Sequence, residues 1–173
     1  MSAADKRARR DPAVESKQKL RLWLRLLRHT RTIEAELRER LRLNFDSTLP
    51  RFDVMAVLYR VGTNPEAKAR KTAGMTMTAL SRQLLVSNGN ATVIVDRLVK
   101  DGFVIRVTHL KDRRSTVVSL TAAGTDLFRA MAAAHESWIA DIMSNVTSHE
   151  TEQLLQLLPP SAPPTSASTS GDL

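Results

Sequence analysis

Apolar positions recur at helical spacing through most of the chain. The longest run lies in residues 14–44, which contain no glycine or proline. One face of this segment, at intervals of three or four residues, is formed by Leu22, Leu26, His29, Ile33, Leu37 and Leu41. The spacing predicts a long amphipathic helix. Such a helix has more apolar length than a small domain usually covers alone, so packing against a second chain is expected.

A second helix is predicted from Pro50 to near Gly62. Two short helices are predicted after it. The loop that precedes them, residues 63–74, is polar and basic. Thr76 is the expected N-cap of the first short helix, and Ser87 is the expected N-cap of the second. Gly102 suits the left-handed position that ends a helix. Two helices joined by so short a turn form a helix-turn-helix.

The period of the pattern then changes from helical to alternating. Apolar and polar positions alternate from residue 103 to 108 and again from 116 to 120, around the charged segment HLKDRRS at 109–115. This pattern predicts two strands and a turn, which together form a small β wing.

Two helices close the pattern. Thr121 begins a helix to about Val146, and Thr147 with Glu150 forms a capping box for a short last helix. The predicted fold is mainly α with a small β wing, a winged helix-turn-helix in residues 14–158. We expect disorder in the basic N-terminal arm, 1–13, and in the Pro/Ser/Thr-rich tail, 159–173.

Composition narrows the possible functions. The chain has 26 Lys and Arg against 18 Asp and Glu, a formal net charge of +8, which favours a polyanionic partner. It has no cysteine, which excludes thiolate chemistry and cysteine-based sensing. Neither an apolar membrane span nor a signal-peptide core is visible, so we expect a soluble cytoplasmic protein. The four histidines are scattered and no catalytic motif is present. We therefore predict no enzyme, metal or cofactor.

The helix-turn-helix and the wing together suit double-stranded DNA. A helix fits the major groove, and a hairpin tip that carries arginine fits the minor groove beside it. The side chains that could read bases or phosphates from the helix are Ser87, Asn88, Asn90, Thr92, Val93 and Arg97. Those expected to act from the wing tip are Lys111, Asp112, Arg113 and Arg114. Asp112 is expected to hold the Arg114 guanidinium in place.

Each of these motifs has another reading when it is taken alone. A charged hairpin tip can be only a solvated turn, and Asn88 and Asn90 can be local helix caps. Arg97 can pair within the chain, with Asp96 or Asp101. A winged helix of this kind can also be an architectural or protein-interacting DNA binder without an effector. The order and spacing of the elements favour a sequence-specific regulator.

The stretch from residue 75 to residue 124 resembles the DNA-binding core of the MarR family of bacterial regulators. The matching parts are LSRQLLVSNGNAT, VDRLVKDGFV, DRRS and SLTAAG. The family's D-x-R wing signature falls on Asp112 and Arg114. The resemblance, over residues 18–158, implies a homodimeric repressor with dimerisation helices at 14–44 and 121–158 and a DNA-binding lobe at 50–120. It also implies a pseudo-palindromic operator with half-sites ~34 Å apart.

The resemblance further implies an effector. Family members are commonly released from DNA by small aromatic molecules, and the first two helices are similar to regulators of aromatic-acid catabolism, some of which respond to CoA thioesters. Aromatic walls with a cation would hold an aromatic carboxylate. The candidate residues are Trp23, Arg25, His29, Arg51, Phe52 and Trp138, with His135 beside them. Alternatively, His29 is a hydrogen-bonded interface residue and Trp138 belongs to the dimer core.

Overall fold

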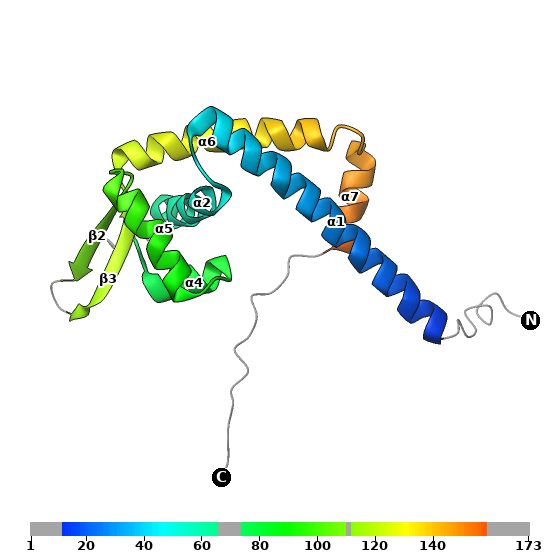
Figure 1. Ribbon diagram of the computed structural model, residues 1–173, viewed down its shortest axis with the longest axis horizontal. Coiled ribbons are helices and arrows are strands. Elements are labelled where there is room, and N and C mark those ends of the chain that lie inside the picture. Colours follow the sequence, from blue (N-terminus) through cyan, green and yellow to red (C-terminus); the bar gives the residue numbers. More distant parts are fainter. Residues whose placement is uncertain (1–11, 66–73, 110–111, 159–173) are drawn as a thin grey trace, which may run out of the picture. The chain divides into compact units, whose positions relative to one another are not determined.

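The computed structural model describes residues 12–65, 74–109 and 112–158 (Figure 1). The side chains of residues 12–13, 108–109 and 112–115 fall outside this description. The chain divides into two compact units, Met1–Leu49 and Pro50–Leu173, which are taken in turn. In the part of the chain that is described, no helix has both the length and the apolarity needed to cross a membrane.

The first unit is dominated by one long helix, α1 (Pro12–Phe45). It begins two residues before the predicted start, because proline lacks an N–H and is readily accommodated in a first helical turn. Salt bridges line its second half: Arg38 to Glu34 at 3.9 Å, Arg40 to Glu36 at 2.7 Å and Arg42 to Glu39 at 2.6 Å.

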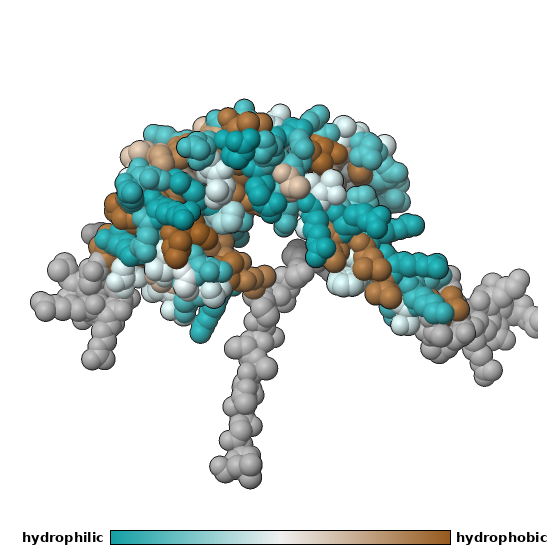
Figure 2. All heavy atoms as spheres, in the orientation of Figure 1, coloured by the Kyte–Doolittle hydropathy of each residue, from teal (hydrophilic) through white to brown (hydrophobic). Residues whose placement is uncertain are grey.

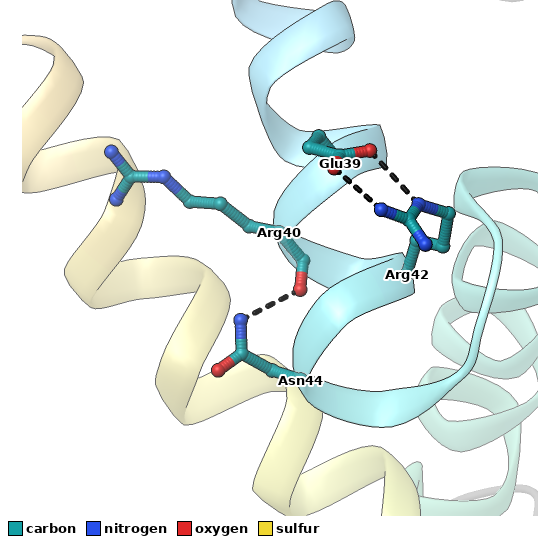
Figure 3. A network of polar contacts seen from close by, with 4 residues as sticks. All are labelled: Glu39, Arg40, Arg42 and Asn44. Atoms are coloured by element: carbon teal, nitrogen blue, oxygen red, sulfur yellow. Dashed lines mark hydrogen bonds and ion pairs between the residues drawn. The ribbon is translucent and has the colours of Figure 1, made fainter.

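Figure 3 shows the end of this row of charges. The Arg42 guanidinium donates two hydrogen bonds to the Glu39 carboxylate, and Asn44 donates to the Arg40 carbonyl at 2.8 Å. After the helix, Asp46 turns the chain with a positive φ of 46°. Aspartate tolerates this conformation better than most residues.

The second unit contains the predicted helix-turn-helix. It follows α2 (Leu49–Thr63) and a two-residue strand, β1 (Met75–Thr76), and consists of α4 (Met77–Leu84) and α5 (Asn88–Lys100). Both predicted N-caps are confirmed: Thr76 accepts from the Ala79 N–H, and Ser87 accepts from the Asn90 N–H. Gly102 ends α5 with a φ of 78°, as expected. Helices α4 and α5 bury an apolar core at Leu80, Ala91, Val95 and Leu98.

The wing is longer in strand than the sequence suggested. Strands β2 (Val104–His109) and β3 (Asp112–Leu120) pair antiparallel, and β1 adds to the other edge of β3, which gives the order β1-β3-β2. The predicted turn at 109–115 is therefore wrong in its bounds, because both strands extend into it. Within the described part of the segment, only His109 and Asp112 are paired, and the register shifts between Thr108 and His109. Strand β1 was missed, since two residues carry no alternating pattern.

Two helices complete the second unit, α6 (Ala122–Ile142) and α7 (Ser148–Leu157). Thr121 caps α6, and the predicted capping box of Thr147 and Glu150 is present at α7. Helix α6 ends four residues earlier than the predicted Val146. Aromatic rings from α2 and α6 pack together: Phe52 lies 5.5 Å from Phe128 and 4.7 Å from His135, between ring centroids.

Candidate nucleic-acid interface

Helix α5 presents one face to solvent and the opposite face to the core of the second unit. Ala91, Val95 and Leu98 are fully buried, whereas Val93 is 54% exposed. Helical periodicity places six exposed positions on one side of α5, and they are Gly89, Asn90, Val93, Asp96, Arg97 and Lys100. This mixture of amide, methyl and cationic groups can contact base edges and phosphates in a major groove.

Three of the side chains proposed to read DNA are engaged within the chain. The Ser87 hydroxyl caps α5, and the Thr92 hydroxyl donates to the Asn88 carbonyl at 2.8 Å. The Asn88 side-chain oxygen accepts a hydrogen bond from the Ser81 hydroxyl, which ties α5 to α4. Asn88 is therefore engaged within the chain, but it links two helices and is not a local helix cap. Asn90 and Val93 remain exposed and outward.

Arg97 is not paired with either of the two carboxylates suggested for it. Asp96 binds Arg106 of β2 at 2.7 Å, and Asp101 binds Arg51 of α2 at 2.7 Å. Among the described residues, Arg97 makes no ion pair, and it is exposed. The intramolecular alternative for Arg97 is therefore wrong, and its guanidinium is available to a partner.

The same two ion pairs brace α5 at different points. One links the middle of the helix to the wing, and the other links its C-terminal end to the start of α2. The carboxylate of each pair is more than a third exposed, so each pair adds only ~0–1 kcal/mol to stability. Their main effect is positional, since they fix how α5 stands against β2 and α2. The sequence prediction missed these pairs, because residues far apart in sequence form them.

Two exposed positions on α5 were also missed, Gly89 and Lys100. Lys100 could have been found, because it lies three residues after Arg97 on the same helical face. Gly89 carries no side-chain chemistry to signal a role. A Cβ added there would meet no atom of the protein within 4 Å, so packing within the chain does not require glycine at this position.

The wing-tip candidates are placed only by their backbone. Asp112, Arg113 and Arg114 lie in β3, and Asp112 stands opposite His109 of β2. Lys111 lies outside the described residues. The register of β2 and β3 shifts between Thr108 and His109, so Arg113 and Arg114 lie in an irregular part of the ladder. The expected tether between Asp112 and Arg114 stays a prediction.

The candidates for an effector pocket fall in both units. Trp23, Arg25 and His29 are exposed on α1. In the second unit, Arg51 is bound to Asp101, and Phe52 is buried. Trp138 is half-buried on α6.

Phe52 is packed from the α6 side by Phe128 and by His135, which stacks on it with ring planes 15° apart. Burial of the His135 imidazole lowers its pKa, since a charged ring is poorly solvated there. Phe52 thus contributes to the core between α2 and α6.

A separate cavity of about 240 Å³ lies within the second unit, near the C-terminal end of α2. Tyr59, Thr63, Ser119 and Arg129 are among its lining residues, and none of the predicted pocket residues lines it. Arg129 donates to the Tyr59 hydroxyl at 3.4 Å and lies over its ring. The Arg129 guanidinium is also 3.6 Å from Asp126.

A helix-turn-helix with an exposed second helix, followed by an antiparallel wing, defines the winged-helix class of DNA-binding protein. Residues 48–116 match the model of the MarR family. BadR of Rhodopseudomonas palustris, named a transcriptional activatory protein, is 29% identical over 90% of this chain and 87% of its own. A MarR variant of E. coli crystallised with operator DNA is 25% identical, covers 86% of this chain and 96% of its own, and has a TM-score of 0.64.

Residues 48–116 thus carry a winged-helix domain of the MarR family, and the proteins to which the chain is similar are named as transcriptional regulators. An uncharacterised regulator of Bacillus subtilis, YkoM, is 38% identical over 45% of this chain. The match spans only 50% of YkoM. The sequence resemblance and the predicted fold class are therefore confirmed.

Proposed function

We propose that the protein is a homodimeric transcription factor that binds a pseudo-palindromic operator with α5 in the major groove and the wing in the adjacent minor groove. The observation that carries this proposal is the exposed face of α5, where the side chains of Asn90, Val93 and Arg97 make no hydrogen bond or ion pair among the described residues. Asn90 would read adenine, Val93 would contact a thymine methyl, and Arg97 would reach guanine or phosphate.

Dimerisation would be supplied by α1, α6 and α7, and the DNA-binding lobe would be residues 50–120. Exposed apolar side chains support this arrangement. Trp23 of α1 is 56% exposed, and Leu155 and Leu157 of α7 are 68% and 75% exposed. Apolar surface of this kind is a common mark of a protein–protein interface. Light scattering should therefore give twice the mass of one chain, and Leu155→Asp with Leu157→Asp should lower it.

The operator is accessible by selection from a pool of duplexes with purified protein at near-physiological salt. We expect recovery of an imperfect palindrome whose half-sites lie ~34 Å apart, one turn of B-DNA. Asn90→Ala should then reduce the preference at one half-site position by ~1–3 kcal/mol. Recovery of duplexes without a common motif would instead favour an architectural DNA binder.

For regulation, we propose repression that is relieved by a small aromatic acid or by its CoA thioester, whose phosphates would meet basic side chains of the N-terminal arm and α1. BadR is named an activator, and YetL of Bacillus subtilis is named a repressor. A reporter gene behind the selected operator distinguishes repression from activation. Expression should fall when the protein is supplied and recover with the effector.

The effector would act through Arg51. This guanidinium holds Asp101 at the C-terminal end of α5. An aromatic carboxylate that binds Arg51 would compete with Asp101 and release that end of the helix. Such a ligand favours a form in which α5 is misplaced, and a coupling of ~1–3 kcal/mol weakens operator binding ~5–150-fold.

Isothermal titration with benzoate and with benzoyl-CoA tests this proposal directly. We expect heat of binding and loss of the operator complex with one of the two ligands. Arg51→Met should abolish both responses. A complete absence of heat and of DNA release with either compound would remove the effector proposal and leave operator binding untouched.

A further inference from the structure

The N-terminal half of α1 carries a row of cations along one side of the helix. Successive members stand four, four, three and three residues apart, and they are Lys17, Arg21, Arg25, Arg28 and Arg31. At 3.6 residues per turn they lie within an arc of about 120°, and at 1.5 Å per residue they extend over ~21 Å. All five are exposed. We call this set the cationic row.

The cationic row differs from the rest of α1 in how its charges are neutralised. In the second half, arginines are paired one turn away with Glu34, Glu36 and Glu39. Within the described part of the chain, no member of the cationic row makes an ion pair. The carboxylates that flank the row are bound elsewhere: Glu15 lies 2.7 Å from Lys19, and Glu34, three residues after Arg31, lies 3.9 Å from Arg38.

This arrangement does not help the helix to form. Like charges three or four residues apart destabilise a helix by about as much as opposite charges stabilise it, ~0.2–0.5 kcal/mol per pair. The second half of α1 uses opposite charges at this spacing, and the first half uses like charges. A solvated surface needs no such row, so the row is better explained by a partner that carries a matching line of negative charge.

We propose that the cationic row binds the phosphodiester backbone of nucleic acid, as a second contact surface outside the helix-turn-helix and the wing. Its length favours a polymer, because a strand of duplex DNA presents a phosphate about every 3.4 Å along the axis and can engage every member. The phosphates of a single CoA would occupy only part of such a row. Arginine suits the role, since its fork of N–H groups matches phosphate oxygens.

The other side of α1 carries the apolar residues that we assign to the dimer. Figure 2 shows hydrophobic and hydrophilic side chains next to each other along the visible face of this helix. Leu22, Leu26 and Ile33 lie roughly opposite the centre of the cationic row by helical periodicity. One helix can therefore serve a protein interface and a nucleic-acid surface at once.

The test compares two triple variants of the full-length chain with equal loss of charge. Arg21→Gln, Arg25→Gln and Arg28→Gln remove the centre of the cationic row. Lys19→Gln, Arg38→Gln and Arg42→Gln remove three cations of the same helix that are paired with carboxylates. Circular dichroism and light scattering confirm that both variants keep their helix content and mass.

The readout is the salt dependence of binding to a 40-base-pair duplex of random sequence. Each lost phosphate contact should lower the slope of log K against log salt by about 0.9, so the row variant should lose about 2.7. The matched control should keep the slope of the unaltered protein. Replacement of the same three arginines by lysine should restore most of it, because lysine keeps the charge.

Three outcomes would overturn the proposal. Equal slopes for the row variant and the unaltered protein would remove nucleic acid as the partner. Equal losses in both triple variants would reduce the effect to net charge. If the row variant binds DNA normally but no longer binds vesicles with 30% phosphatidylserine, the cationic row would be assigned to a membrane surface.

The proposal for the cationic row and the proposal for operator binding predict different effects, so one can fail without the other. The row variant should weaken binding to the selected operator and to random duplexes by the same factor, so that their ratio stays constant. Asn90→Ala should change that ratio and leave the salt slope nearly unchanged. The two surfaces can thus be confirmed or rejected independently.

Discussion

Gly89 offers a test in which folding and DNA binding should respond in opposite directions. It lies in the first turn of α5, on the exposed face between Asn88 and Asn90. No part of the protein comes within 4 Å of a Cβ at this position, and its φ is not in the left-handed region. The fold therefore does not require glycine here. A partner that approaches the helix backbone closely would require it.

The size of both effects can be worked out. Glycine in a helix is ~0.5–1 kcal/mol less favourable than alanine, so Gly89→Ala should stabilise the fold by about that amount. For a chain of this size the melting temperature should rise by ~1–4 °C. On DNA, an added methyl in a closely packed contact costs ~1–3 kcal/mol. That cost corresponds to ~5–150-fold weaker operator binding.

Differential scanning calorimetry measures the first effect, and fluorescence anisotropy with the selected operator measures the second. A variant that is more stable and binds more weakly supports close approach of DNA at Gly89. A variant that binds the operator as tightly as the unaltered protein would refute it. The first turn of α5 would then not lie against the duplex, and Asn90 could not contact adenine as proposed.

Four other outcomes follow from the structure. Gly124→Ala should destabilise the fold by ~3 kcal/mol or more in urea unfolding, because its Cβ would clash with the Phe103 carbonyl oxygen. Arg97→Ala should weaken operator binding and leave the unfolding free energy within about 0.5 kcal/mol, because Arg97 has no ion pair among the described residues. Arg114→Ala should weaken operator binding strongly without loss of the dimer, as native mass spectrometry can check. His135→Phe should reduce the loss of stability in acid: burial lowers the His135 pKa, so the stability is present above the unfolded pKa of ~6.5 and is lost as pH falls through the folded pKa.

The elements whose signals are local could be predicted closely from the sequence. Thr76, Ser87, Thr121 and Thr147 each cap a helix where expected, because a capping side chain bonds to a backbone N–H only two or three residues away. The same holds for Gly102, where the end of α5 needs a left-handed residue. Such interactions depend only on a few consecutive residues, so the sequence alone predicts them.

Features that depend on contacts between distant segments could not be predicted. The alternation in residues 103–108 did not show which side of the wing is buried. In the structure, Val104 and Val118 are buried, while Ile105 and Val107 are about half exposed. The side is set by the register in which β2 pairs with β3, with Arg106 opposite Val118. A period of two allows either face to be the inner one.

The candidate site shows the same division, with a consequence for mechanism. Composition and spacing predicted Asn90, Val93 and Arg97 as DNA-reading residues, and all three are exposed, but the sequence did not reveal the ion pairs of Asp96 and Asp101. Pairs as exposed as these contribute little to stability. Ala91, Val95 and Leu98 are fully buried, so apolar packing holds α5 on the core, and the two ion pairs affect only its orientation. A ligand or DNA phosphate that competes for Arg51 or Arg106 would therefore change the orientation of α5 at small energetic cost while its buried side stays in place.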